Sequence, residues 1–155
     1  MSSLDTGAKQ VGDLTEKVFD FLGRMERLVS DAKGAVSSDY WAPLTEFVAV
    51  DEFKRSVPEN AFPATEGGTD PWALSVMDWP RYLKCFDLWV SASPTFSNVI
   101  KRIAEFPGLV YLEIEEHHGD SIFNSLSTYE FNDEGKICGI RVASAANSLI
   151  VPNAG

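Results

Sequence analysis

Basic residues, histidines and cysteines are scarce in this chain. Its 155 residues include 13 lysines and arginines against 23 acidic residues, a net charge of −10, and only two histidines and two cysteines. A surface of this charge repels the phosphates of nucleic acids and disfavours docking on anionic membranes. The two cysteines, Cys85 and Cys138, are too few for a zinc site, and in a reducing compartment they serve as small apolar side chains. We therefore expect no nucleic-acid partner and no metal site.

Long apolar runs are missing as well. The first ten residues, MSSLDTGAKQ, are polar and lack the apolar segment of a signal peptide. Elsewhere no apolar run reaches the length that crosses a bilayer. We therefore expect a cytoplasmic protein that does not associate with a membrane.

Apolar and aromatic side chains are plentiful. Hydrophobic residues make up 45% of the chain, with 10 Phe, 4 Trp and 4 Tyr. Such a chain is too apolar to be disordered, and its length suits one domain with a sizeable core. We expect a flexible tail over residues 1–10, a single domain over residues 11–146 and a C-terminal tail over residues 147–155.

The first half of the chain shows helical spacing of apolar residues. Between Val11 and Ala32 they recur at steps of three and four, which predicts an amphipathic helix, and Asp13 with Glu16 offers a capping box as an alternative start. Two further helices are predicted, one over Tyr40–Val48 with Asp39 as its cap and one that opens at Asp78-Trp79-Pro80. A short strand is predicted around Phe53–Val57.

Residues 58–77 form the longest stretch without periodicity. They hold three prolines and two glycines, which predicts a long loop. Phe62 and Trp72 favour a lid that packs on the domain, whereas the small residues around them favour a disordered insertion.

The second half of the chain shows the alternation of strands. Turn residues at 107–108, 118–120 and 132–135 separate the alternating segments. Consecutive strands joined by short turns, after a helical half, imply an antiparallel meander and an α+β fold. The predicted strands are Phe96–Glu105, Leu109–His118, Phe123–Phe131 and Lys136–Ser144.

Three segments carry a resemblance to a known family. They are MDWPRYLKCFDLW at 77–89, IKRIAEFPGLVYLEIEE at 100–116 and YEFNDEGKICGIRV at 129–142. With the order of helices and strands, they make residues 12–144 resemble the nuclear-transport-factor-2-like superfamily, which includes SnoaL-like polyketide cyclases and ketosteroid isomerase. The resemblance implies a cone-shaped, curved antiparallel sheet around an apolar cavity, packed against three helices from the N-terminal half. It specifies no reaction, because this fold hosts many chemistries.

Ketosteroid isomerase itself uses an aspartate base, a tyrosine on the first helix and a protonated aspartic acid on a late strand. At the matching positions this chain has Ser56, no tyrosine between Val11 and Ala32, and Ser127. Asp51 matches a different aspartate, which follows the second helix and has a capping role. The resemblance therefore does not carry steroid isomerisation over to this chain.

The family's face assignment turns a row of apolar and hydroxyl side chains inward, with Val110, Leu112 and Ile114 as an apolar wall. This suits an uncharged hydrophobic ligand, and the alternative is that the same side chains fill a solid core. Aromatic residues of the helices could add hydrogen-bond donors. The predicted ligand-binding residues are Trp41, Tyr82, Trp89, Phe123, Ser125, Ser127, Ile140, Val142 and Ser144.

Three residues are candidates for acid–base catalysis: Asp51, Glu116 and His118. Glu116 and His118 share one face of their strand, whereas His117 faces the other way, so the pair could act at the mouth of a pocket. The alternative is that they belong to a solvated turn. Asp51 could shuttle a proton at the edge of an apolar cone, although this residue could equally serve to end the second helix.

These features lead us to expect a SnoaL-like enzyme that performs cofactor-independent proton transfer on a hydrophobic organic substrate, by isomerisation, cyclisation or dehydration. Two alternatives stay open. One is a non-catalytic domain that binds a small hydrophobic molecule. The other is an interaction domain that forms a homodimer through the outer face of the sheet, where Tyr111 and Leu126 lie.

Overall fold

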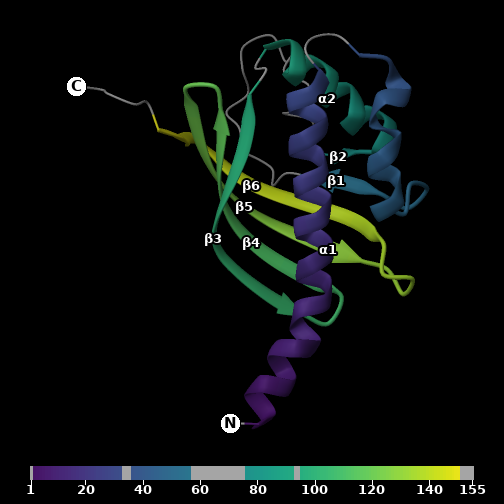
Figure 1. The fold of residues 1–155 in the computed structure, drawn as a ribbon, viewed down its shortest axis with the longest axis vertical. Coiled ribbons are helices and arrows are strands. Elements are labelled where there is room, and N and C mark those ends of the chain that lie inside the picture. Colours follow the sequence, from purple (N-terminus) through teal and green to yellow (C-terminus); the bar gives the residue numbers. More distant parts are fainter. Residues whose placement is uncertain (1, 33–35, 57–75, 93–94, 151–155) are drawn as a thin grey trace.

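A computed structural model of the chain describes residues 2–32, 36–56, 76–92 and 95–150 (Figure 1). Helical elements fill most of the first half and long strands fill the second, as the sequence predicts. The elements are α1 (Ser2–Ala32), the 3₁₀ helix η1 (Ser38–Phe47), β1 (Lys54–Ser56), β2 (Val76–Met77), α2 (Trp79–Ala92), β3 (Phe96–Phe106), β4 (Leu109–His118), β5 (Ser121–Phe131) and β6 (Ile137–Ile150).

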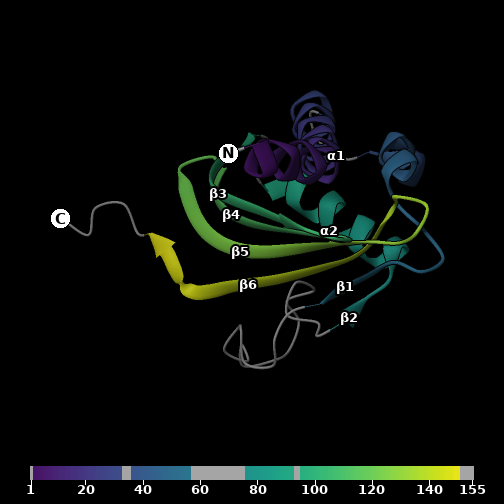
Figure 2. The same cartoon turned by 90° about the horizontal axis from the view of Figure 1, so that it is seen from below.

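The strands form one six-stranded sheet in the order β2-β1-β6-β5-β4-β3. All neighbours are antiparallel except β1 and β6, which run parallel. Figure 2 shows the sheet as a curved band with α1 across its concave side. The predicted α+β class and the curved, mostly antiparallel sheet are confirmed. The meander forms because each of its turns has a glycine with a positive φ, which residues with a Cβ rarely adopt.

Helix and strand extend past the predicted domain bounds of residues 11–146, which themselves stay a prediction. α1 begins at Ser2, inside the segment predicted as a flexible tail over residues 1–10. Where the capping box was expected, the amide and the hydroxyl of Thr15 both donate to Glu105 Oε1 on β3, each at 2.7 Å. This carboxylate therefore docks the helix on the sheet.

The last strand also runs further than expected. β6 continues to Ile150, so residues 147–150 of the predicted C-terminal tail are part of the sheet. The register explains the early predicted end: Ser125 pairs with Ser144, but Phe123 pairs with Leu149, so several residues of β6 bulge out between these pairs. Such a bulge interrupts the alternation from which a strand is recognised.

The second helix is a 3₁₀ helix rather than an α-helix. Trp41 and Leu44 are fully buried and Phe47 is half-buried, which matches the three-residue turn of a 3₁₀ helix. Its N-cap is Ser37, and no side chain caps it, so Asp39 does not have the predicted capping role. In α2, by contrast, Asp78 Oδ1 accepts a hydrogen bond from the Arg81 amide at 3.1 Å, which confirms the predicted cap.

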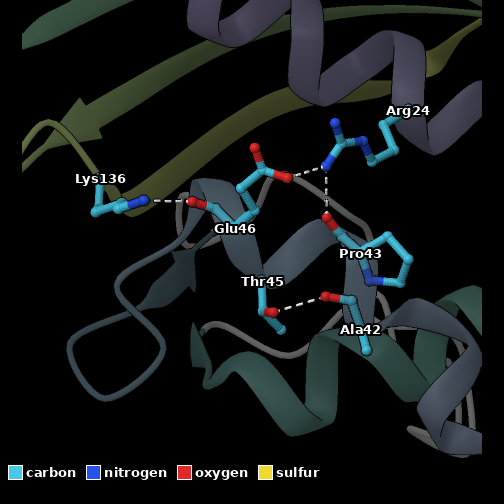
Figure 3. A network of polar contacts seen from close by, with 6 residues as sticks. All are labelled: Arg24, Ala42, Pro43, Thr45, Glu46 and Lys136. Carbon is cyan, nitrogen blue, oxygen red and sulfur yellow. Dashed lines mark hydrogen bonds and ion pairs between the residues drawn. The ribbon is translucent and has the colours of Figure 1, made fainter.

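Polar contacts fix η1 between α1 and the sheet (Figure 3). Arg24 of α1 pairs with Glu46 and donates to the carbonyl of Pro43. On the other side, Lys136, beside the β5–β6 turn, donates to the carbonyl of Glu46 at 2.5 Å. These contacts place the buried face of η1 against the core, where Trp41 packs on Phe86.

The predicted loop over residues 58–77 lies almost entirely outside the described residues. Only Val76 and Met77 are described, as the short strand β2. The choice between a lid and a disordered insertion therefore stays open.

Candidate functional site

The concave face of the sheet carries a row of buried side chains that crosses four strands. Arg55 of β1 pairs with Ile140 of β6, which pairs with Tyr129 of β5, which pairs with Val110 of β4. None of these four residues is more than 4% exposed. The neighbouring inward positions on β5 are Ser127 and Ser125, at 4% and 2% exposure. The inward direction predicted for both serines and for Ile140 therefore agrees with the structure, while their ligand-binding role stays a prediction.

Arg55 is the residue that sequence reasoning missed. The resemblance pointed to Ser56 at this end of β1, but Ser56 faces outward and Arg55 is buried. A signal was present in the sequence, because Phe53 is a large apolar residue two positions before Arg55. Residues two apart share a face of a strand, so a buried Phe53 implies an inward Arg55. A strand of three residues is too short for this alternation to stand out.

Glu116 also lies on the inner face, towards the end of β4. It pairs with Asn98 of β3 and Phe123 of β5, and it is half-buried. Burial raises the pKa of its carboxyl from 4.5 to about 7, although the guanidinium of Arg55 opposes this shift. At neutral pH the acid and the carboxylate of Glu116 are therefore present in similar amounts.

His118 follows on the same face of β4. Its ring lies 5.2 Å from that of Phe96 and 5.1 Å from that of Phe123. Burial, and then the neighbouring His117, lower the pKa of His118 from 6.5 to about 4, so its imidazole is neutral at pH 7. His117 points the other way and contacts Glu115 Oε1 at 2.7 Å, which confirms that the two histidines do not share a face.

Two buried tyrosines complete what we call the inner cluster: Arg55, Tyr82, Glu116 and Tyr129. Burial raises the pKa of Tyr82 above its usual value, with Arg55 opposing and Glu116 adding to the shift. Burial likewise raises the pKa of Tyr129, and Tyr82 and Glu116 add to it. Because each tyrosine feels both charged groups, the four side chains lie within Coulombic reach of one another. Both phenols stay protonated at neutral pH and can donate hydrogen bonds.

Comparisons with known proteins agree with this architecture. Neither the protein-family models nor the curated proteins gave a match. Among solved structures, an NTF2-like protein of unknown function from Cytophaga hutchinsonii matches 84% of this chain and 88% of its own, with 11% identity and a TM-score of 0.57. This chain has the NTF2-like fold.

Two further solved structures that match this chain are named as enzymes. SalBIII, an epoxide hydrolase/cyclase-like enzyme with a role in pyran ring formation in the polyether salinomycin, covers 88% of this chain and 94% of its own, with 11% identity and a TM-score of 0.61. An LEH-like epoxide hydrolase from M. tuberculosis covers 90% and 88%, with 14% identity and a TM-score of 0.57. At these identities the matches establish the fold, and the chemistry must be argued from the residues of this chain.

The remaining predicted site residues of this NTF2-like chain are not members of the inner cluster, although Phe123 pairs with Glu116 across β4 and β5. Asp51 is exposed in the turn before β1. Trp41 is buried, and its Nε1 donates to Asp87 Oδ1 at 2.6 Å, which joins η1 to α2. Val142 and Phe123 are half-buried on the inner face. Trp89 and Ser144 belong to α2 and β6, but their side chains lie outside the described set.

Two surface depressions lie outside the cone. One, of about 390 Å³, is on the convex face and is lined by Ser56, Cys138 and Arg141 among others. The other, of about 200 Å³, lies between α1, η1 and the β5–β6 turn. Neither reaches the inner cluster, so the predicted pocket inside the NTF2-like cone stays a prediction.

Among the described residues, no three His, Cys, Asp or Glu side chains lie together in a group that could hold a metal ion. Both cysteines are free thiols, as predicted. Within the described part of the chain, no helix combines the length and apolar character that a membrane span requires.

Proposed function

We propose that this NTF2-like protein is a small-molecule enzyme that transfers a proton on a hydrophobic organic substrate without a cofactor, in an isomerisation, cyclisation or dehydration. The observation that carries the proposal is the carboxyl of Glu116 on the inner face, with a pKa of about 7. An acid–base group is most effective when its pKa lies near the working pH, because both of its forms are then available.

Arg55 and the tyrosines supply the second part of the chemistry. Removing a proton next to a carbonyl leaves negative charge on the substrate oxygen. A fixed guanidinium and protonated phenols in surroundings of low polarity stabilise such a charge more than water does. In this scheme Glu116 takes the proton and later returns it, while Arg55, Tyr82 and Tyr129 hold the oxygen. His118, neutral at pH 7, borders the site beside Phe123.

The solved matches support the class of the proposal. SalBIII is named as an epoxide hydrolase/cyclase-like enzyme and the M. tuberculosis protein as an LEH-like epoxide hydrolase. Both descriptions concern organic small molecules. Their substrates are not assigned to this chain, for which the proposal depends on the inner cluster.

Proton exchange gives a test that does not require the natural substrate. A panel of cyclic ketones and β-keto esters is incubated with the protein in D₂O, and deuterium incorporation next to the carbonyl is followed by mass spectrometry. We expect at least one ketone to exchange faster than its buffer control, and Glu116→Gln to lower that rate about 100-fold. Glu113→Gln is the matched control, because Glu113 lies on the same strand but pairs with Arg102 on the outer face.

The binding-only hypothesis predicts a different result in the same experiment. A non-catalytic domain would be stabilised thermally by members of the panel, yet none would exchange. Its support is that Ser127, a neutral hydroxyl, stands where ketosteroid isomerase has an acid. Full exchange in Glu116→Gln would exclude our catalytic assignment.

The homodimer hypothesis concerns a different surface. Leu126 of β5 is 43% exposed on the outer face of the sheet, and Tyr111 lies on the same face. Light scattering that shows a monomer at all working concentrations would exclude it.

A further inference from the structure

Two buried polar atoms near the inner cluster are unsatisfied. Trp79 and Ser125 are each only 2% exposed. Within the described structure, neither Trp79 Nε1 nor Ser125 Oγ has a hydrogen-bond partner. An unmade hydrogen bond of this kind costs about 1–3 kcal/mol, so native proteins rarely keep one without a reason. The indole N–H can only donate, so an acceptor is what would satisfy it.

Trp79 and Arg55 lie at the same end of the cone. Met77 of β2 pairs with Arg55 of β1, and Trp79 opens α2 two residues later. The ring of Trp79 lies 5.1 Å from that of Phe53, which shares the inner face of its segment with Arg55. Tyr82 stacks on the same Phe53 ring at 5.5 Å. An indole donor, a phenol and a guanidinium therefore surround one small region.

The charges of this region favour an anion. Arg55 is always protonated, whereas burial keeps much of Glu116 neutral at pH 7. The guanidinium is the charged group that opposes the shift of Glu116, and it acts on both tyrosines. A guanidinium keeps its positive charge even where it is buried, so it adds to the donors that this region offers to an anion.

The surroundings of Glu116 differ from those of Trp79. Asn98, paired with Glu116 across β3 and β4, has a buried Oδ1 without a partner in the described residues, whereas its amide and its Nδ2 donate to Glu26 of α1. An acceptor there does not attract an anion. The donors at Arg55 and Trp79 and the acceptor at Asn98 would therefore orient a bound ligand, with its anionic group towards Arg55 and Trp79.

We propose that the ligand is a hydrophobic monocarboxylate whose carboxylate binds Arg55 and Trp79 Nε1 and whose apolar part lies along the inner face of β4 and β5. Arginine suits this role because its planar fork matches the two oxygens of a carboxylate. The uncharged ligand expected from the sequence is replaced by an anionic one. The inference rests on the proposed function only for the location of the site.

Octanoate and octanamide are suitable probes, because they share a chain and differ in charge. Isothermal titration calorimetry at pH 7 measures both dissociation constants. We expect wild-type protein to bind octanoate at least tenfold more tightly than octanamide. Equal affinities, or no heat of octanoate binding up to 20 mM, would overturn the proposal without any variant.

Three variants locate the effect. Arg55→Met should abolish the octanoate preference, because it removes the charge that distinguishes the two probes, whereas octanamide loses only a hydrogen bond to its oxygen. Trp79→Phe should weaken both probes severalfold, because each offers an acceptor oxygen. Arg102→Met is the control, because Arg102 is an exposed arginine on the outer face, and it should bind like wild type. An octanoate preference that survives in Arg55→Met would contradict the assignment.

Folding of the variants is followed by circular dichroism. If Arg55→Met does not fold, Arg55→Lys replaces it. In Arg55→Lys the octanoate preference should fall but not vanish, because lysine keeps the positive charge but lacks the planar guanidinium that binds both carboxylate oxygens. Proton exchange and carboxylate preference are separate readouts. An octanoate preference without ketone exchange would leave this inference standing and remove the proposed function, and the reverse result would remove this inference alone.

Discussion

Glu116 and His118 stand two residues apart on one face of β4 and respond to burial in opposite ways. Low polarity disfavours the charged form of any group. It therefore raises the pKa of the glutamic acid to about 7 and lowers that of the histidine to about 4. Both side chains are thus kept neutral over most of the range between pH 4 and pH 7.

These shifts predict how stability depends on pH. The folded state holds a proton on Glu116 that the unfolded state loses above pH 4.5, so this residue lowers stability as pH rises from 4.5 to about 7. His118 stays neutral when folded but is protonated below pH 6.5 when unfolded, so it lowers stability as pH falls from 6.5 to about 4. Each effect amounts to at most about 3 kcal/mol. Between pH 4.5 and 6.5 the two slopes should cancel in urea unfolding of the wild type.

Single variants separate the two slopes. Glu116→Gln should become less stable as pH falls from 6.5 to 4.5, whereas His118→Gln should become less stable as pH rises over the same range. Glu113→Gln on the outer face should keep the flat profile. Identical profiles in all four proteins would show that neither group is perturbed.

The rate of proton exchange should follow the ionisation of the same carboxyl. As a base, Glu116 works only when deprotonated, so kcat/KM for ketone exchange should rise between pH 6 and pH 8 with a midpoint near 7. The residual rate of Glu116→Gln should lack this midpoint. A wild-type midpoint near pH 4.5 would mean that the carboxyl is solvated.

The inward position of some of these side chains can be predicted from the sequence, and that of others cannot. Alternation in β4, ten residues long, places Glu116 and His118 on one face without a structure. Arg55 lies on a three-residue strand, and an arginine between polar neighbours is usually at the surface. The only local sign of its burial is Phe53 two positions earlier, and the pairing with β6 that holds Arg55 in place is long-range.

The cap of α2 is a local feature whose contribution to the stability of the protein can be measured. Asp78 Oδ1 accepts the Arg81 amide, and loss of such a cap costs about 1 kcal/mol. Asp78→Ala should therefore lower the melting temperature by about 3 °C. Differential scanning calorimetry measures this change. Asp133→Ala, in the exposed turn between β5 and β6, should melt within 1 °C of wild type, and an equal loss in both would argue against the cap.

Long elements are predicted better than short ones for a physical reason. The meander of β3 to β6 is visible because turns and alternation are local. The 3₁₀ form of η1 is set by packing of Trp41 and Leu44 in the core, and the bulge of β6 is set by its register with β5. The docking of α1 through Thr15 and Glu105 joins residues 90 positions apart, which a local pattern cannot show.

At the scale of the whole molecule, the net negative charge of the protein opposes the approach of the proposed anionic ligand. The net charge of −10 repels an anion at long range, whereas Arg55 attracts it only at contact. Salt screens the first interaction more than the second, because buried pairs are screened less. Stopped-flow association of octanoate should therefore become roughly threefold faster between 20 and 300 mM NaCl, with no change for octanamide. A slower association of octanoate in salt would imply a cationic approach path.

The three residues of β1 are held by β6 on one side and by the two-residue β2 on the other. Few amide hydrogen bonds keep this strand in place, so we expect it to open more readily than the meander. A fatty acid bound to the guanidinium of Arg55 would then hold β1 against the sheet, so that ligand binding would complete the folding of this strand. Amide exchange at Arg55 should be rapid in the free protein and slow severalfold with saturating octanoate, while the amides of β4 stay protected throughout.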